Sequence, residues 1–171
     1  QKKIDAVKED IKSGWDGIEV DGKEVEVDLI TKTSSEGGTE KSYDQIELLS
    51  GGGQSKVIIK DEYGNIIGRN QGLQYMRDLT NGKAQDFNVS GFFYMNSPSG
   101  SYAHEYGHIA GYLYEEYVID SKGKPVLNMI GGRTPVNDLL SKSIMFSPSG
   151  NNKGMAHHIR KIMDVNKCNS K

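Results

Sequence analysis

Two histidines four positions apart, His104 and His108, constrain the fold of this chain more than any other feature. Residues at this spacing lie on one face of an α-helix, one turn apart, so both imidazoles can reach the same metal ion. Catalytic zinc is held by neutral histidine nitrogens and keeps a position for water, and a carboxylate beside that water can take its proton. With Glu105 after the first histidine, the pattern H-E-x-x-H predicts a helix that supplies two zinc ligands and a general base. The simpler interpretation is a pair of solvated histidines on a surface helix.

The residues around the motif favour that helix. Hydroxyl side chains within 97–101 are candidate N-caps, and no proline or β-branched run interrupts residues 103–110. Gly111 can end the helix, because glycine adopts the left-handed conformation at little cost. Gly107 costs a helix interior about 1 kcal/mol relative to alanine. We therefore expect Gly107 to allow close packing of the helix against a neighbour.

The spacing from His104 to Gly111 resembles the metzincin pattern H-E-x-x-H-x-x-G-x-x-H/D, in which the glycine turns the chain toward a third ligand. The expected ligand position holds Tyr114 here, so the chain departs from that pattern. Residues 115–117 resemble the D-E-Y of bacterial toxin-type peptidases after a one-residue insertion. On that alignment Glu115 is the third zinc ligand and Glu116 the alternative, whereas adjacent acids in general are solvated.

Two later segments extend the resemblance. Residues 143–146 resemble the Met-turn, whose methionine, here Met145, forms an apolar floor beneath the metal in metzincins. Taken alone, Met145 would be an ordinary core methionine. His157 and His158 open a helix whose apolar face recurs at helical spacing. Relatives carry a histidine at a comparable place, so His158 is a reserve ligand; otherwise the pair lies on an exposed helix start.

The rest of the sequence predicts other elements at lower specificity. We expect an amphipathic first helix that ends near Gly14. We expect the strand region 91–96 to bind extended substrate through backbone hydrogen bonds. The region between Tyr117 and Leu139 is expected to form a hairpin and a loop over a cleft. Further strands are expected at 24–30, 46–49, 57–59 and 66–67, and a short helix at 73–79.

Composition indicates a single domain over residues 1–171, with 166–171 as a flexible tail. The net charge of -2 and the dispersed basic residues give no electrostatic reason to expect nucleic acid as a partner. No apolar run approaches the length of a membrane span, so we expect no membrane insertion. The single cysteine, Cys168, cannot form an internal disulfide. The first residue, Gln1, and the lack of a signal-peptide core favour a processed form or a domain cut from a longer protein.

In element order, residues 10–166 resemble small bacterial metzincin-like metallopeptidases that form the C-terminal toxin domains of polymorphic or Rhs-type secreted effectors. The resemblance implies an α+β fold with a small twisted mixed sheet, an active-site helix, a Met-turn-like segment and a C-terminal helix. It also implies Zn²⁺ as cofactor, a protein or peptide substrate, delivery by a bacterial secretion system, and an inhibitor or immunity protein as partner. We expect a monomer.

Three functions follow from these observations. The leading one is a zinc endopeptidase that uses His104, His108 and Glu115 as ligands and Glu105 as general base. The second keeps the metal but cleaves an amide of cell-wall peptide, because the chemistry is shared. The third is a catalytically degenerate peptidase fold that serves as a binding module, which the tyrosine at the expected ligand position favours.

Overall fold

The described residues of the chain form an α+β fold with small sheets and the α-helices α1, α3 and α4. This computed structural model describes residues 2–36, 45–53, 55–60, 66–69, 88–112, 116–118, 120–122, 124–147 and 152–165. The expected α+β class is therefore confirmed. The elements are α1 (Lys2–Trp15), β1 (Glu19–Val20), β2 (Lys23–Glu24), β3 (Gln45–Leu49), β4 (Lys56–Lys60), β5 (Ile66–Arg69), β6 (Asn88–Tyr94), α3 (Ser101–Ile109) and α4 (Ala156–Val165), with short 3-10 helices at Ser34–Glu36 and Asp138–Lys142.

The larger sheet is mixed, with the strand order β3-β6-β4-β5. Strand β6 runs parallel to β3 and antiparallel to β4, and β4 runs antiparallel to β5. Since β6 already has a hydrogen-bonded neighbour on each side, it offers no free edge to an extended peptide. The expectation that residues 91–96 pair with substrate is wrong for this strand.

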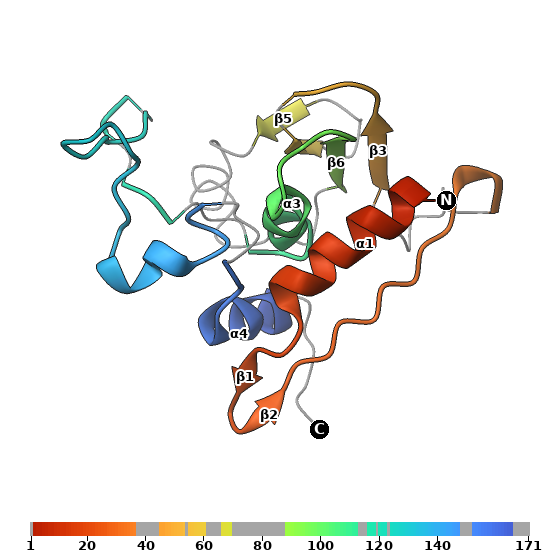
Figure 1. Ribbon diagram of the computed structural model, residues 1–171, viewed down its shortest axis with the longest axis horizontal. Helices are drawn as coiled ribbons and strands as arrows, with labels where there is room; N and C mark the ends of the chain where they lie inside the picture. Colours follow the sequence, from red (N-terminus) through yellow and green to blue (C-terminus); the bar gives the residue numbers. More distant parts are fainter. Residues whose placement is uncertain are drawn as a thin grey trace.

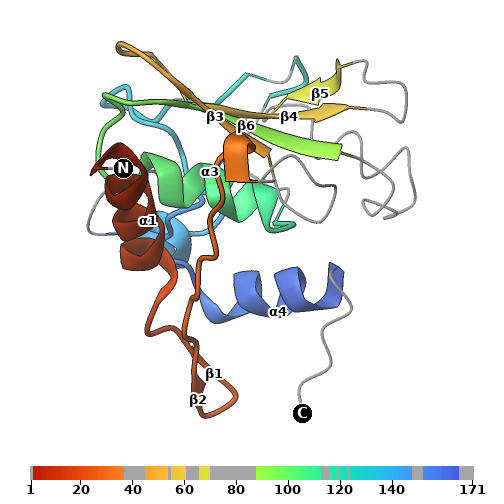
Figure 2. The ribbon, with the colours of Figure 1, turned by 90° about the vertical axis from the view of Figure 1, so that its right-hand side faces the viewer.

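Helix α3 lies at the centre of the molecule. The four-stranded sheet covers one side of α3, while α4 lies on the other side (Figure 2). Helix α1 crosses α3 (Figure 1), and the two helices approach closely because α1 has a glycine at the crossing. A Cβ on Gly14 would lie 2.5 Å from the Cβ of Ala103, so no larger residue fits without movement. The indole of Trp15 donates a hydrogen bond to the Ala103 carbonyl at 2.7 Å.

The core fills the space between α1, α3 and the sheet. As the helical spacing of its apolar residues predicts, α1 buries Ile11 and Trp15 on one face. Phe93 of β6 is fully buried and stacks on Tyr102 of α3, with ring centroids 5.3 Å apart. Such aromatic burial is a large contributor to the stability of a small domain.

The strand expected at 24–30 is wrong beyond Glu24, where β2 ends. The alternation of apolar residues is real, since Val25, Val27 and Leu29 pack against the core while the residues between them are exposed. Their backbone groups bind the chain just after α1: Val25 N donates to Ile18 O, and Val27 N donates to the Asp16 carboxylate. Alternating burial therefore occurs here without a neighbouring strand.

The segment after Tyr117 forms the expected hairpin, with an antiparallel bridge between Leu127 and Arg133. The side chain of Asn128 accepts hydrogen bonds from the backbone of Ile130 and Gly132, which fixes the tip. This hairpin, residues 124–134, extends away from the rest of the molecule (Figure 1). Its tip exposes large apolar side chains, Leu127, Met129 and Ile130.

The remaining expectations concern membrane insertion, a short helix at 73–79 and a flexible tail at 166–171. Among the described residues, no helix combines the length and the apolar character needed to cross a bilayer. The helix expected at 73–79 and the tail at 166–171 lie outside the described residues.

Candidate metal centre

Helix α3 carries the H-E-x-x-H motif, and its N-terminus is capped by a side chain from α1. The residue before the helix, Gly100, has a φ of 86° and no side chain to cap it. The carboxylate of Asp10 accepts hydrogen bonds from the backbone N–H groups of Gly100 at 2.6 Å, Tyr102 at 3.0 Å and Ala103 at 3.3 Å. A carboxylate at this position also interacts favourably with the positive end of the helix dipole. The expectation of a hydroxyl N-cap within 97–101 is wrong, because Asp10 takes these N–H groups.

The back of α3 packs tightly, as the glycine in the motif predicts. A Cβ on Gly107 would lie 2.6 Å from the sulfur of Met145 and 2.6 Å from the ring of Trp15. Met145 is fully buried, in a turn where its N–H donates to the Ser143 hydroxyl. This methionine therefore lies directly against the motif helix, and its role as the floor of a metal site stays a prediction. Gly111 has a φ of 116°, which confirms it as the turn that ends the helix.

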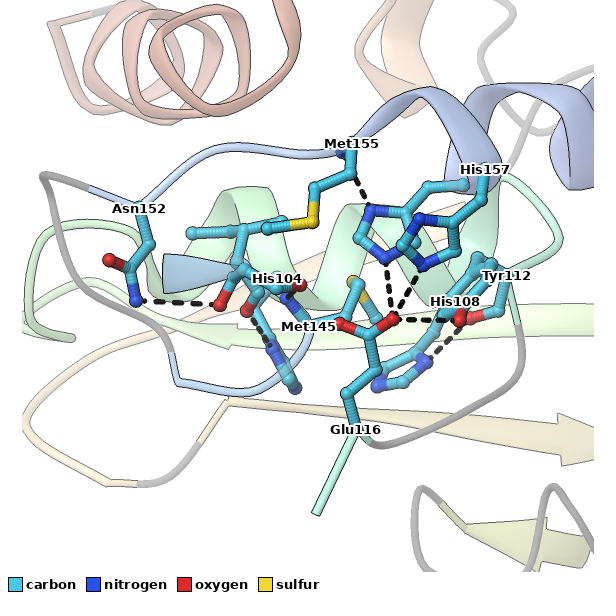
Figure 3. A network of polar contacts seen from close by, with 11 residues as sticks. His104, His108, Tyr112, Glu116, Met145, Asn152, Met155 and His157 are labelled. Carbon is cyan, nitrogen blue, oxygen red and sulfur yellow. Dashed lines mark hydrogen bonds and ion pairs between the residues drawn. The ribbon is translucent and has the colours of Figure 1, made fainter. Parts of the chain in front are cut away.

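His104 and His108 are buried side by side, with ring centroids 4.9 Å apart. The Nδ1 atom of His104 lies 2.7 Å from the carbonyl oxygen of Ile144, and that of His108 lies 2.9 Å from the carbonyl oxygen of Tyr112. A carbonyl oxygen only accepts, so each Nδ1 carries the hydrogen. In a neutral ring the lone pair then belongs to Nε2, which is the tautomer that binds a metal through Nε2. Figure 3 shows both rings held in this way.

A buried carboxylate, Glu116, lies beyond the end of α3. Its Oε1 atom accepts hydrogen bonds from the Tyr112 hydroxyl at 2.9 Å and from two imidazoles of α4, His157 at 2.7 Å and His158 at 2.8 Å (Figure 3). The backbone N–H of Glu116 donates to the carbonyl of Met145 at 3.2 Å. Glu116 therefore joins α4, the turn at Met145 and the chain after α3.

Glu116, His157 and His158 can hold a metal ion as judged by proximity, because one ligand atom from each lies within 4.8 Å of the others. His158 is fully buried, whereas the side chain of His157 is 45% exposed. This group, the only one found among the described residues, contains neither His104 nor His108.

The tautomer of His158 is opposite to that of the motif histidines. Its Nδ1 atom accepts a hydrogen bond from the backbone N–H of Met155 at 2.9 Å. The backbone N–H only donates, so in the neutral ring the hydrogen lies on Nε2 and points at Glu116. His158 thus reaches back to the residue before α4, as the third residue of a capping box does. The hydrogen-bond pattern presents His158 Nε2 as a donor.

The electrostatics of this group favour an ionised carboxylate. Burial raises the pKa of Glu116, but hydrogen bonds from His158, Ser143 and His157 outweigh it and lower the pKa to about 2. Burial is also the main reason that the pKa of His158 is lowered, which favours its neutral form. Burial, followed by the charge of Glu116, raises the pKa of Tyr112, so its hydroxyl stays protonated and donates.

The structure places part of the expected site. His104, Glu105 and His108 are all buried on α3. The expected third ligand, Glu115, and Tyr114 at the metzincin ligand position lie outside the described residues. The alternative ligands, Glu116 and His158, contact each other, and their assignment stays a prediction.

Sequence reasoning missed two residues of this centre, Asp10 and Tyr112. Asp10 lies next to Ile11 in an ordinary amphipathic helix, and no local signal marks it as the cap of another helix. Tyr112 follows Gly111 directly, at the turn that the glycine predicts. That position could have indicated that its carbonyl faces the end of the helix and so His108.

Comparison of the chain with protein-family models, with curated proteins and with solved structures returned no match.

Proposed function

We propose that this protein is a zinc-dependent endopeptidase in which His104 and His108 bind the metal and Glu105 acts as general base. The observation that carries the proposal is the pair of Nδ1 hydrogen bonds to the carbonyls of Ile144 and Tyr112. These bonds leave two adjacent buried rings with the Nε2 lone pairs that zinc would need. Solvated histidines on a surface helix would have neither the burial nor the shared tautomer.

The donor set fits zinc, which takes neutral imidazole nitrogen and leaves a position open in catalytic sites. Zinc held there would polarise the scissile carbonyl and lower the pKa of a water molecule. Glu105 follows the first ligand on the same buried helix. Its carboxylate would take the proton from the attacking water and pass it to the leaving amine.

For the third ligand we propose Glu115. Its competitors, Glu116 and His158, are hydrogen-bonded to each other, and His158 presents a hydrogen on Nε2 where a ligand needs a lone pair. Binding metal through this nitrogen would require the loss of both its hydrogen and its bond to Glu116. This argues against His158. Glu116 keeps a second buried oxygen, Oε2, without a hydrogen-bond partner, so the preference for Glu115 rests on its alignment with the D-E-Y segment.

The resemblance to effector toxin domains supports a secreted role and an unstructured protein or peptide as substrate. Strand addition to β6 does not contribute, because that strand lies inside the sheet. An inhibitor or immunity protein remains part of this proposal.

The test is metal analysis combined with one substitution. Protein purified without chelator should hold about one zinc per chain. Glu105→Gln should keep that zinc and lose cleavage of an unstructured protein, while Glu36→Gln, on an exposed 3-10 helix, should change neither. Protein free of metal, or a Glu105→Gln variant with full turnover, would contradict the proposal. Cleavage of purified cell-wall peptide alone would shift it to the amidase.

A further inference from the structure

We propose that Glu116 is a positioning residue for the metal centre: its carboxylate and its backbone hold the two chain segments whose carbonyls orient His104 and His108. This inference rests on the proposed zinc function. It assigns to Glu116 a role outside the metal's ligands, in place of the alternative role as a ligand.

The first link runs through a side chain. Oε1 of Glu116 accepts from the Tyr112 hydroxyl at 2.9 Å, and the carbonyl of the same tyrosine accepts from Nδ1 of His108 at 2.9 Å. Both ends of Tyr112 are thereby fixed, one by the carboxylate and one by the ligand. Removing the hydroxyl contact would take away one attachment of Tyr112, while its N–H would still donate to the carbonyl of Gly107 at 2.9 Å.

The second link runs through the backbone. The N–H of Glu116 donates to the carbonyl of Met145 at 3.2 Å, and the neighbouring carbonyl of Ile144 accepts from Nδ1 of His104 at 2.7 Å. Met145 is fully buried against Gly107, so this turn cannot move without disturbing α3. One residue therefore connects to the orienting carbonyl of each histidine.

The carboxylate itself is held from α4. His158 is fully buried, its Nδ1 is occupied by the Met155 N–H, and its Nε2 donates to Glu116 at 2.8 Å (Figure 3). His157 donates to the same oxygen from a half-exposed position. A buried anion with its donors fixed by a helix is a rigid point of attachment. Hydrogen-bond partners of metal-binding side chains set the orientation and basicity of those side chains.

The experiment measures zinc affinity and histidine tautomers in four variants of the full chain. Tyr112→Phe removes the hydroxyl link and keeps the carbonyl, and Glu116→Gln keeps the shape and removes the charge. His157→Ala removes the exposed donor to the same oxygen. Val57→Ala, in the buried part of β4, is a control that lowers stability away from these contacts.

Tyr112→Phe and Glu116→Gln should each weaken zinc binding about 10- to 100-fold while the bound amount at saturation stays the same. In the metal-free protein, ¹⁵N NMR should show Nδ1–H for His104 and His108 in the wild type and in Val57→Ala. His108 should become a mixture of tautomers in Tyr112→Phe. A loss of stability alone would not produce that change, so this readout separates positioning from folding.

The outcomes are distinguishable. A wild-type protein that binds no zinc would overturn the proposed function and this inference together. A zinc-binding protein whose affinity and tautomers are unchanged in Tyr112→Phe would overturn the inference alone, even if Glu116→Gln fails to fold. Loss of a bound zinc in His157→Ala would place the metal in the group of Glu116, His157 and His158, which would also overturn the inference.

Discussion

The two histidine pairs of this protein have opposite chemistry, although each lies on a helix and close to a buried carboxylate. His104 and His108 on α3 face backbone carbonyls with Nδ1, whereas His158 on α4 faces a backbone N–H with the same atom. The partner of Nδ1 therefore decides what Nε2 can do. On α3 it is a potential ligand, and on α4 it is a donor that binds Glu116.

The largest effect should come from removing one histidine of the α3 pair. His108→Ala should reduce bound zinc from about one per chain to near zero, because two protein ligands hold catalytic zinc poorly where three are usual. His157→Ala is the matched control and should keep its zinc. Metal analysis of the two purified variants checks this, and equal zinc contents would remove the distinction between the pairs.

The same distinction should appear in thermal stability. With free zinc at about 1,000 times its Kd, binding stabilises the folded state by about 4 kcal/mol, which corresponds to about 10 °C in Tm for a chain of this size. Chelation should therefore lower the Tm of the wild type and leave that of His108→Ala unchanged. Calorimetry with and without chelator would show it.

The next prediction compares how much each histidine of α4 contributes to the free energy of unfolding. His158→Ala should destabilise the fold by about 3–5 kcal/mol, because it removes a fully buried donor from a buried carboxylate. His157→Ala should cost less than about 1 kcal/mol, since its contact with Glu116 is partly exposed to solvent. Urea unfolding measures both, and similar losses would mean that burial does not distinguish the two contacts.

A smaller effect concerns how the two helices begin. Helix α3 depends on Asp10 of α1, whereas α4 depends on its own His158. Asp10→Ala should cost about 1 kcal/mol, and Asp10→Asn should retain most of the stability because asparagine also caps helices. Urea unfolding of Asp10→Ala and Asp10→Asn measures both free energies of unfolding. If Asp10→Ala leaves the free energy of unfolding unchanged, α3 needs no cap from another helix.

The smallest effect is expected at the exposed ion pair of α4, between Arg160 and Asp21, in contrast to the buried contact between His158 and Glu116. The hydrogen bond and then the charge of Arg160 lower the pKa of Asp21, and both side chains are largely exposed. Arg160→Ala should raise that pKa toward its ordinary value of 3.8. The pair's contribution to folding is present above that value and is lost as the pH falls through the lower folded pKa. NMR titration of the Asp21 carboxyl checks the direction; an unchanged pKa would show that the ion pair does not form in solution.

Local sequence patterns predicted the parts of this molecule that local contacts determine. The spacing of His104 and His108 predicted the helix, and Gly111 predicted where it ends. Gly107 predicted the close packing behind the helix. The spacing did not reveal the tautomers, because the carbonyl that faces His104 comes from a residue 40 positions later. No periodicity carries information about which backbone group will face a side chain.

Other expectations failed for a related reason. The alternation at Val25 and Val27 predicts a strand, but it reports only which side chains are buried and not which backbone groups pair. The hydroxyls before α3 were read as caps, but a carboxylate 90 positions earlier in the chain reaches the same N–H group of Gly100. Side-chain contacts between distant elements override local preferences in both cases.

The contact between α1 and α3 also bears on how the protein acquires its shape during synthesis. The Trp15 indole and the Ala103 carbonyl are separated by 88 positions, and the backbone of Gly154 donates to Gly14 from still further along the chain. Contacts of such long range form late, because a large loop must close first, and they slow folding. The motif helix gains its neighbours on both sides only after α4 has left the ribosome. A nascent chain would therefore have no assembled centre until α4 has been synthesised.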